Sequence, residues 1–338
     1  MRFGAAAPWS LGVEEELFLV DRRTLETAPG FSRLFGEPTA EIKAEVFECL
    51  VEIATPVASD AEAVLDELVR RRQDVEARAG AHGLGIFAAG THARARAAGQ
   101  PIVPLPRYRR MAKRLGDRVH RQIVCGLHVH VSVPDADACL RAFEGVVPWL
   151  PTLLALSANS PFAEGRPSGR RSERAVRLLE MPTGGTPPLV PDWAAWEEAT
   201  AGDESRRHWD AWPRPIYGTL ELRVADQQTS VRRSAGFAAL AQALVATASE
   251  RDVEPYDRRL YEERRERAVV DAPDPDEVAA LAALVEPAAR RLRGWPLVEE
   301  LLAGRPEAER QLELAPRGLD AVLADVRART TRMGAWPS

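Results

Sequence analysis

Three consecutive glutamates interrupt an apolar run near the start of the chain, SLGVEEELFLVD at residues 10–21. Side chains of a strand alternate between two faces. Glu14 and Glu16 therefore point to one face, and Glu15 points to the other face with the leucines. Two carboxylates this close repel each other, and their pKa values rise unless a cation lies between them. A divalent ion that prefers oxygen ligands satisfies such a pair, although a solvated acidic edge strand gives the same pattern.

Paired ionisable residues at even spacing recur in three later stretches, each time on the parity opposite to the apolar side chains. This pattern predicts one open sheet face that carries all of them. The pairs are Glu48 with Glu52, His128 with His130, and Glu221 with Arg223. None contains a lysine, and carboxylates with imidazole match Mg²⁺ or Mn²⁺ better than zinc. An arginine near such an ion is typical of sites that bind phosphate.

Composition sets limits on the class of protein. The 338 residues are 45% hydrophobic and 28% charged, with a net charge of −5, which is typical of a globular protein and gives no basic face for nucleic acid. We expect no membrane span and no signal peptide, because the sequence shows neither a long apolar run nor a basic start followed by an apolar core. Three cysteines without a CxxC pair favour a reducing cytoplasm.

The order of strand and helix patterns predicts the fold class. We expect strands over 10–21, 45–56, 84–92, 122–133 and 214–227, and helices over 60–79, 106–120 and 136–159, the last interrupted by two prolines. The tract 160–191 is rich in Gly, Pro and Arg and predicts a long functional loop. From residue 230 onward the pattern is helical, best over 238–248, 277–293 and 318–333. Alternating strands predict an α+β protein whose antiparallel or mixed sheet has helices on one face.

Several motifs, in order, resemble the carboxylate–amine ligase family, also called glutamate–cysteine ligase type 2. They cover about two thirds of the chain, from residue 12 to residue 227. The matching motifs are GVEEELFLVD (12–21), Glu45 through EIATP (52–56), AAGTH (88–92), RYRRM (107–111), CGLHVHV (125–131), LSANSPF (156–162), MPTGG (181–185) and YGTLELRVADQ (217–227).

The resemblance implies a glutamine-synthetase-like catalytic fold, a curved and mainly antiparallel β-sheet funnel with helices outside, as one domain over 1–338. It implies that ATP activates a carboxylate as an acyl phosphate, which an amine then attacks, with two or three Mg²⁺ ions in the funnel and Mn²⁺ as a substitute. The implied substrates are small molecules, the γ-carboxylate of glutamate and the amine of cysteine, with weak activity. The implied metal ligands are Glu14, Glu16, Glu45, Glu52, His128 and Glu221.

Other roles follow from the same resemblance. Arg223 and Glu221 are the implied catalytic residues, with Arg223 and Arg174 on the nucleotide phosphates. Arg174, His130 and His92 are the implied substrate contacts, although a loop arginine and packed core histidines are alternatives. Glu45 falls on the wrong parity of a plain strand, so its role requires a bend or bulge.

Some positions depart from the family pattern or stay outside it. Ala163 and Trp212 stand where the family usually has tryptophan and arginine, which leaves the substrates open. We expect His82, His120 and His208 at the surface, and Cys49 and Cys125 as small core residues.

Two functions compete with the ligase. A metal-dependent hydrolase would use the same carboxylates without nucleotide and without Arg223. A non-catalytic binding protein that retains the fold would have lost some of the metal ligands. Nothing in the sequence fixes the oligomeric state, and a homo-oligomer is compatible with it.

Overall fold

A sheet of antiparallel strands forms the centre of the protein in a computed structural model, which describes residues 1–96, 98–202, 208–251 and 255–333. Within these residues the strand order is β10-β11-β5-β1-β3-β2, and β4 also pairs with β1. Every pair in this sheet is antiparallel, which confirms the predicted fold class. The strands are β1 (Leu11–Asp21), β2 (Ile42–Ala44), β3 (Leu50–Ala54), β4 (Leu84–Phe87), β5 (Gly126–Ser132), β10 (Ala211–Arg214) and β11 (Thr219–Asp226).

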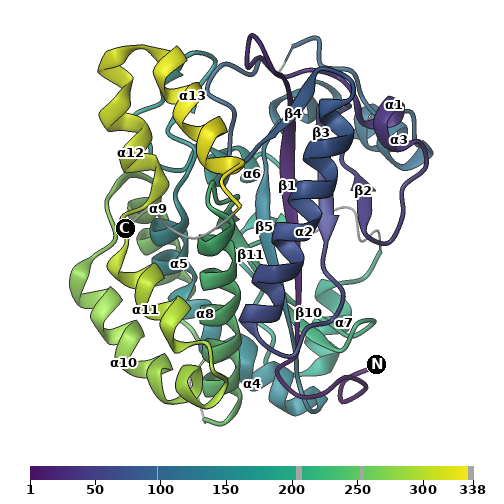
Figure 1. The fold of residues 1–338 in the computed structure, drawn as a ribbon. Coiled ribbons are helices and arrows are strands. Elements are labelled where there is room, and N and C mark those ends of the chain that lie inside the picture. Colours follow the sequence, from purple (N-terminus) through teal and green to yellow (C-terminus); the bar gives the residue numbers. More distant parts are fainter. Residues whose placement is uncertain (97, 203–207, 252–254, 334–338) are drawn as a thin grey trace.

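Helices cover the face of the sheet that carries the apolar side chains. Figure 1 shows α2 lying across the sheet beside β1, with α8 and the C-terminal helices, coloured green to yellow, stacked next to it. Within the described residues the helices are α1 (Phe31–Phe35), α2 (Ala61–Gly80), α3 (Pro106–Leu115), α4 (Ala136–Val146), α5 (Leu150–Ser157), α6 (Glu173–Leu178), α7 (Trp193–Ala199), α8 (Val231–Ser249), α9 (Arg258–Val270), α10 (Pro275–Arg291), α11 (Trp295–Ala303), α12 (Glu307–Leu314) and α13 (Leu319–Thr330).

Helix α8 joins the C-terminal helices to the sheet. It packs against α2, α4, α10 and α11, and nearly all of its side chains are buried. Its many alanines let these neighbours approach closely. The helical segment Ala136–Ser157 is long and apolar enough to cross a membrane by its length and composition alone. However, 67% of its most apolar 18-residue stretch is buried inside the protein. That burial is typical of a core helix.

The predicted strand over 45–56 is wrong in its first half. The chain instead forms a hairpin, in which β2 pairs with β3 and residues 45–49 make the turn between them. The side chain of Glu48 consequently does not join the polar face of the sheet. It instead accepts hydrogen bonds from the Ser32 amide at 2.9 Å and the Ser32 hydroxyl at 2.5 Å. Alternation alone missed the turn because β2 and β3 are both too short to show a period.

The remaining differences concern short elements. The tract after residue 160 contains α6 and the two-residue strands β6 (Phe162–Ala163), β7 (Arg166–Pro167) and β8 (Gly184–Gly185), the last paired with β9 (His208–Trp209). The hairpin partner of β11, β10, was not predicted. Helix α2 begins where expected, with the Asp60 side chain accepting from the Ala63 amide at 3.0 Å.

Glu15 lies on the apolar face of β1, as its parity predicts, and forms a buried ion pair there. Both Glu15 and Arg72 of α2 have no exposed surface. Arg72 donates to the two carboxylate oxygens of Glu15 at 2.8 Å and 2.6 Å, and Ser234 of α8 adds a contact at 2.5 Å. This pair fixes β1 against two helices, directly behind the neighbouring glutamates of the open face.

Candidate active site

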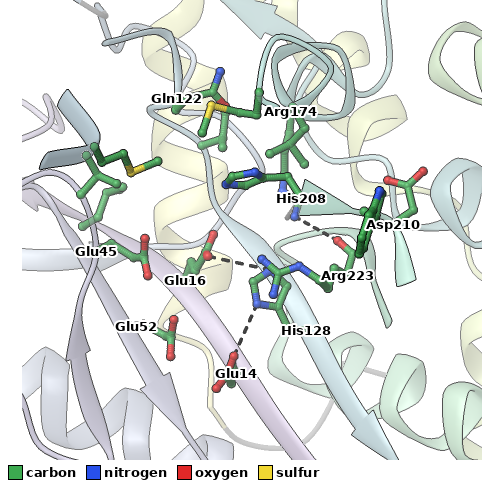
Figure 2. A pocket seen from close by; sticks show the side chains of 17 residues that line it. Glu14, Glu16, Glu45, Glu52, Gln122, His128, Arg174, His208, Asp210 and Arg223 are labelled. Atoms are coloured by element: carbon green, nitrogen blue, oxygen red, sulfur yellow. Dashed lines mark hydrogen bonds and ion pairs between the residues drawn. The ribbon is translucent and has the colours of Figure 1, made fainter. Parts of the chain in front are cut away.

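The open face of the sheet forms the wall of a cavity. Strand register places Glu14 opposite His128, Glu16 opposite Glu52, and Glu221 opposite His130. The polar residues that line the cavity come from six segments of the chain and are labelled in Figure 2: Glu14, Glu16, Glu45, Glu52, Gln122, His128, Arg174, His208, Asp210 and Arg223. Of the predicted pairs on β1, β5 and β11, Glu14, Glu16, His128 and Arg223 line this cavity, whereas His130 and Glu221 are not among its lining residues.

Two groups of side chains within the described residues could each hold a metal ion. In each group, one ligand atom from every member lies within 4.8 Å of the others. The first group is Glu14, His128 and Glu221, and the second is Glu16, Glu45 and Glu52. Glu45 reaches the second group from the turn after β2, which is the bend that its parity required. Carboxylate oxygens with one imidazole fit Mg²⁺ or Mn²⁺.

Repulsion between these carboxylates shifts their pKa values. Burial raises the pKa of Glu45, and the charges of Glu16 and Glu52 raise it further. Burial likewise raises the pKa of Glu52, with Glu14 adding to it. Burial also favours the neutral form of Glu14, but its contact with His128 and the nearby charge of Lys43 outweigh burial and lower the pKa of Glu14. Glu45 and Glu52 are therefore disfavoured as charged groups, and a cation placed between them would favour their charged forms.

One cation already reaches this cluster from the edge of the sheet. The ammonium of Lys43, on β2, lies 2.5 Å from Glu14 and 2.7 Å from Glu52. Burial opposes its charge, but Glu52 and Glu14 outweigh burial and raise the pKa of Lys43. The expectation of a face without lysine is wrong, because β2 was not recognised as a strand.

The opposite end of the site is basic. Glu221 accepts hydrogen bonds from the indole of Trp212 and the guanidinium of Arg214, both at 2.9 Å, and from Arg223. Although burial disfavours its charge, Arg223, His130 and Arg214 lower the pKa of Glu221 to about 2. A β-bulge, the register shift between Leu222 and Ala225, interrupts the pairing at Arg223. Arg223 lines the cavity and shares the face of Glu221, as predicted.

Arg174 enters the cavity from helix α6, and it is almost fully buried. It donates to the carbonyls of Val224 at 3.2 Å and Arg223 at 3.0 Å. Burial lowers the pKa of Arg174. Its guanidinium fits only because residue 126 is glycine, since a Cβ there would lie 2.3 Å from Arg174 Nη2 and 2.9 Å from His128 Nε2.

His130 and His92, the two predicted substrate contacts, are not among the residues that line this cavity. His130 lies beside Glu221, and its Nδ1 is 3.0 Å from the Thr219 hydroxyl. His92 is buried, with Nε2 2.8 Å from the Leu25 carbonyl and its ring against Phe87. The structure gives no direct support to a substrate contact by His92, and its placement fits a residue that orders a loop.

Sequence reasoning missed three of the polar residues that line the cavity. His208, which was expected at the surface, is half-buried and lines the cavity, and Asp210 follows two residues later. Asp210 accepts from the Tyr261 hydroxyl and from Arg265 Nε, both at 2.6 Å. Gln122 completes this side. His208 lies on the two-residue strand β9, and Gln122 and Asp210 lie outside the helices and strands, so side-chain period gives no orientation for any of them.

An antiparallel sheet thus presents carboxylates, an imidazole and an arginine to one cavity. Over residues 10–330 the sequence matches the glutamate–cysteine ligase family 2, and the chain belongs to this family. It is an ATP-dependent carboxylate–amine ligase.

The chain is similar to named relatives over most of its length. A Rubrobacter xylanophilus protein, provisionally named glutamate–cysteine ligase 2-3, is 38% identical over 79% of this chain and 77% of its own. The glutamate–cysteine ligase of Natronomonas pharaonis is 32% identical over 93% of both chains.

Solved structures agree on the fold alone. A bifunctional glutathione synthetase from Pasteurella multocida superposes with a TM-score of 0.70 at 16% identity, over 96% of this chain. The chain spans 52% of that protein. A glutamate–cysteine ligase from Francisella tularensis, solved in complex with AMP, gives a TM-score of 0.68 at 14% identity, over 97% of this chain and 91% of its own.

Proposed function

We propose that this ligase transfers the γ-phosphoryl group of ATP to a substrate carboxylate and then joins the carbonyl carbon to an amine. In the first step a carboxylate oxygen attacks the γ-phosphorus and ADP leaves. In the second, the amine nitrogen attacks the acyl phosphate, inorganic phosphate leaves, and the nitrogen loses a proton. The observation that carries the proposal is the polarity of one cavity, acidic at Glu14, Glu16, Glu45 and Glu52 and basic at Arg223 and Arg174.

Divalent ions would neutralise ATP phosphates beside the carboxylates, which otherwise repel them. Glu14, His128 and Glu221 would hold one ion, and Glu16, Glu45 and Glu52 another, because each group offers converging ligand atoms. Mg²⁺ is the proposed ion, with Mn²⁺ as a substitute.

The protein side chains have proposed roles of their own. Arg223 would grip phosphate oxygens through its planar fork, and Glu221 orients that fork through their hydrogen bond. Arg174 would bind a phosphate or the substrate carboxylate. His130 would contact the substrate next to Glu221. His92 would affect substrate binding only indirectly, by ordering the loop at Leu25.

The proposed substrates are glutamate, through its γ-carboxylate, and cysteine, through its amine, as the names of the relatives suggest. An ADP-release assay with ATP and Mg²⁺ across a panel of amino acids and amines tests this. We expect ADP only when a carboxylate and Mg²⁺ are both present, and amide only when the amine is added. Hydrolysis of panel compounds without nucleotide would contradict the ligase reaction.

Metal dependence has a separate test. Calorimetry of ATP binding in EDTA and then in Mg²⁺ should show measurable affinity only with Mg²⁺. Equal ATP affinity in both buffers would contradict the proposed metal positions.

A further inference from the structure

The ammonium of Lys43 lies between the two groups of candidate metal ligands. Lys43 is directly opposite Glu52 in the β2–β3 pair, and it also reaches Glu14 on β1. Glu14 belongs to the group with His128, whereas Glu52 belongs to the group with Glu16. A single lysine on an edge strand therefore connects both groups and spans three adjacent strands.

The contacts of Glu14 show how Lys43 shares this carboxylate. Oxygen Oε1 of Glu14 contacts Lys43 at 2.5 Å, while Oε2 lies 3.5 Å from Nδ1 of His128. In Glu52, Oε1 lies 2.7 Å from the ammonium. Lys43 thus contacts one oxygen of a carboxylate in each group, which places its positive charge beside both groups.

We propose that Lys43 is a positioning residue whose ammonium acts as a permanent cation of the site. It holds Glu14 and Glu52 together when divalent ions are away, and it opposes the ions when they arrive. Divalent ions then bind tightly only with nucleotide, whose phosphates supply further oxygen ligands. This inference rests on the metal positions of the proposed function.

Three variants test the inference: Lys43→Met, which removes the charge, Lys43→Arg, which keeps it, and Lys113→Met as the matched control. Lys113 is the only other lysine of the sequence, and it is exposed on α3. Each protein is purified in Mg²⁺ and then dialysed into EDTA. The measurements are the unfolding temperature in EDTA and in Mg²⁺, and the Mg²⁺ dissociation constant without nucleotide.

Lys43→Met should unfold at least about 3 °C lower than the wild type in EDTA, because two carboxylates lose their counter-ion. The same variant should bind Mg²⁺ about 10-fold more tightly, since a competing positive charge has gone. Added Mg²⁺ should therefore recover most of its unfolding temperature. Lys43→Arg should stay close to the wild type, and Lys113→Met should not differ from it.

The opposite signs of the two effects separate this role from ordinary packing, which would lower stability without tightening Mg²⁺. Unchanged or weaker Mg²⁺ binding by Lys43→Met would overturn the inference, as would an unchanged unfolding temperature in EDTA. If no variant binds Mg²⁺, both the inference and the metal positions are wrong. If Mg²⁺ affinities follow the expected order but no ADP is released, the proposed reaction is wrong and the role of Lys43 stands.

Discussion

Replacement of Glu15 by glutamine should destabilise the protein strongly, because it leaves Arg72 buried with its charge unmatched. Arg72 has no exposed surface, and its other acceptors are the carbonyls of Thr229 at 2.8 Å and Gln228 at 2.9 Å. Two of the hydrogen bonds that Glu15 accepts are charge-assisted contacts from Arg72. Glutamine keeps one acceptor oxygen but not the charge, so two charged bonds of about 1.5–3 kcal/mol each become one neutral bond of about 1 kcal/mol, a loss of roughly 2–5 kcal/mol. Removal of one partner from a buried ion pair costs a comparable 3–5 kcal/mol, on the order measured elsewhere.

Urea unfolding of wild type and Glu15→Gln, followed by circular dichroism, measures this loss of unfolding free energy. Glu197→Gln is a matched control, because Glu197 is exposed on α7, and it should stay within about 0.5 kcal/mol of wild type. The double variant Glu15→Leu with Arg72→Met should lose less than the sum of the two single changes. A loss below about 1 kcal/mol for Glu15→Gln, the scale of a surface ion pair, would refute the reasoning.

Three further predictions concern the site and its surroundings. Glu221→Gln and Arg223→Lys should both keep the fold and reduce ADP release by about 10²-fold or more. Only Glu221→Gln should weaken Mg²⁺ binding. Normal turnover by Arg223→Lys would show that Arg223 has no role in phosphoryl transfer. Gly126→Ala should displace Arg174, because the added Cβ would lie 2.3 Å from its Nη2. Steady-state kinetics should then show that the KM for ATP or for the carboxylate is raised by roughly 10-fold. Unchanged KM values would show that Arg174 binds neither substrate. Burial lowers the pKa of His92 to about 4, below its unfolded value of about 6.5. The contribution of neutral His92 to the unfolding free energy is therefore complete above pH 6.5 and declines as the pH falls towards 4, by up to about 3 kcal/mol. Urea titrations of His92→Gln at several pH values should lack that part of the pH dependence.

The sequence by itself determined which side chains of each long strand share a face. Glu14 and Glu16 on β1 face the cavity while Glu15 faces the helices, and the same alternation separates the polar and apolar residues of β5 and β11. Side-chain alternation is a local property of the extended backbone, so no distant contact is needed to predict it. The order of motifs also carried the family, and the match over residues 10–330 confirms it.

Only the tertiary structure decided which residues meet in the cavity. Glu45 reaches the cavity from the turn of the β2–β3 hairpin, and Lys43 on β2 contacts Glu14 and Glu52 beside it. Periodicity did not predict this hairpin, because its strands are short. Arg174, His208 and Asp210 come from the short helix α6, the two-residue strand β9 and the bend after it, where the chain path depends on contacts such as that between Asp210 and Arg265. Strand order and loop paths depend on contacts between residues far apart in the sequence, and a pattern along one segment does not reveal those contacts.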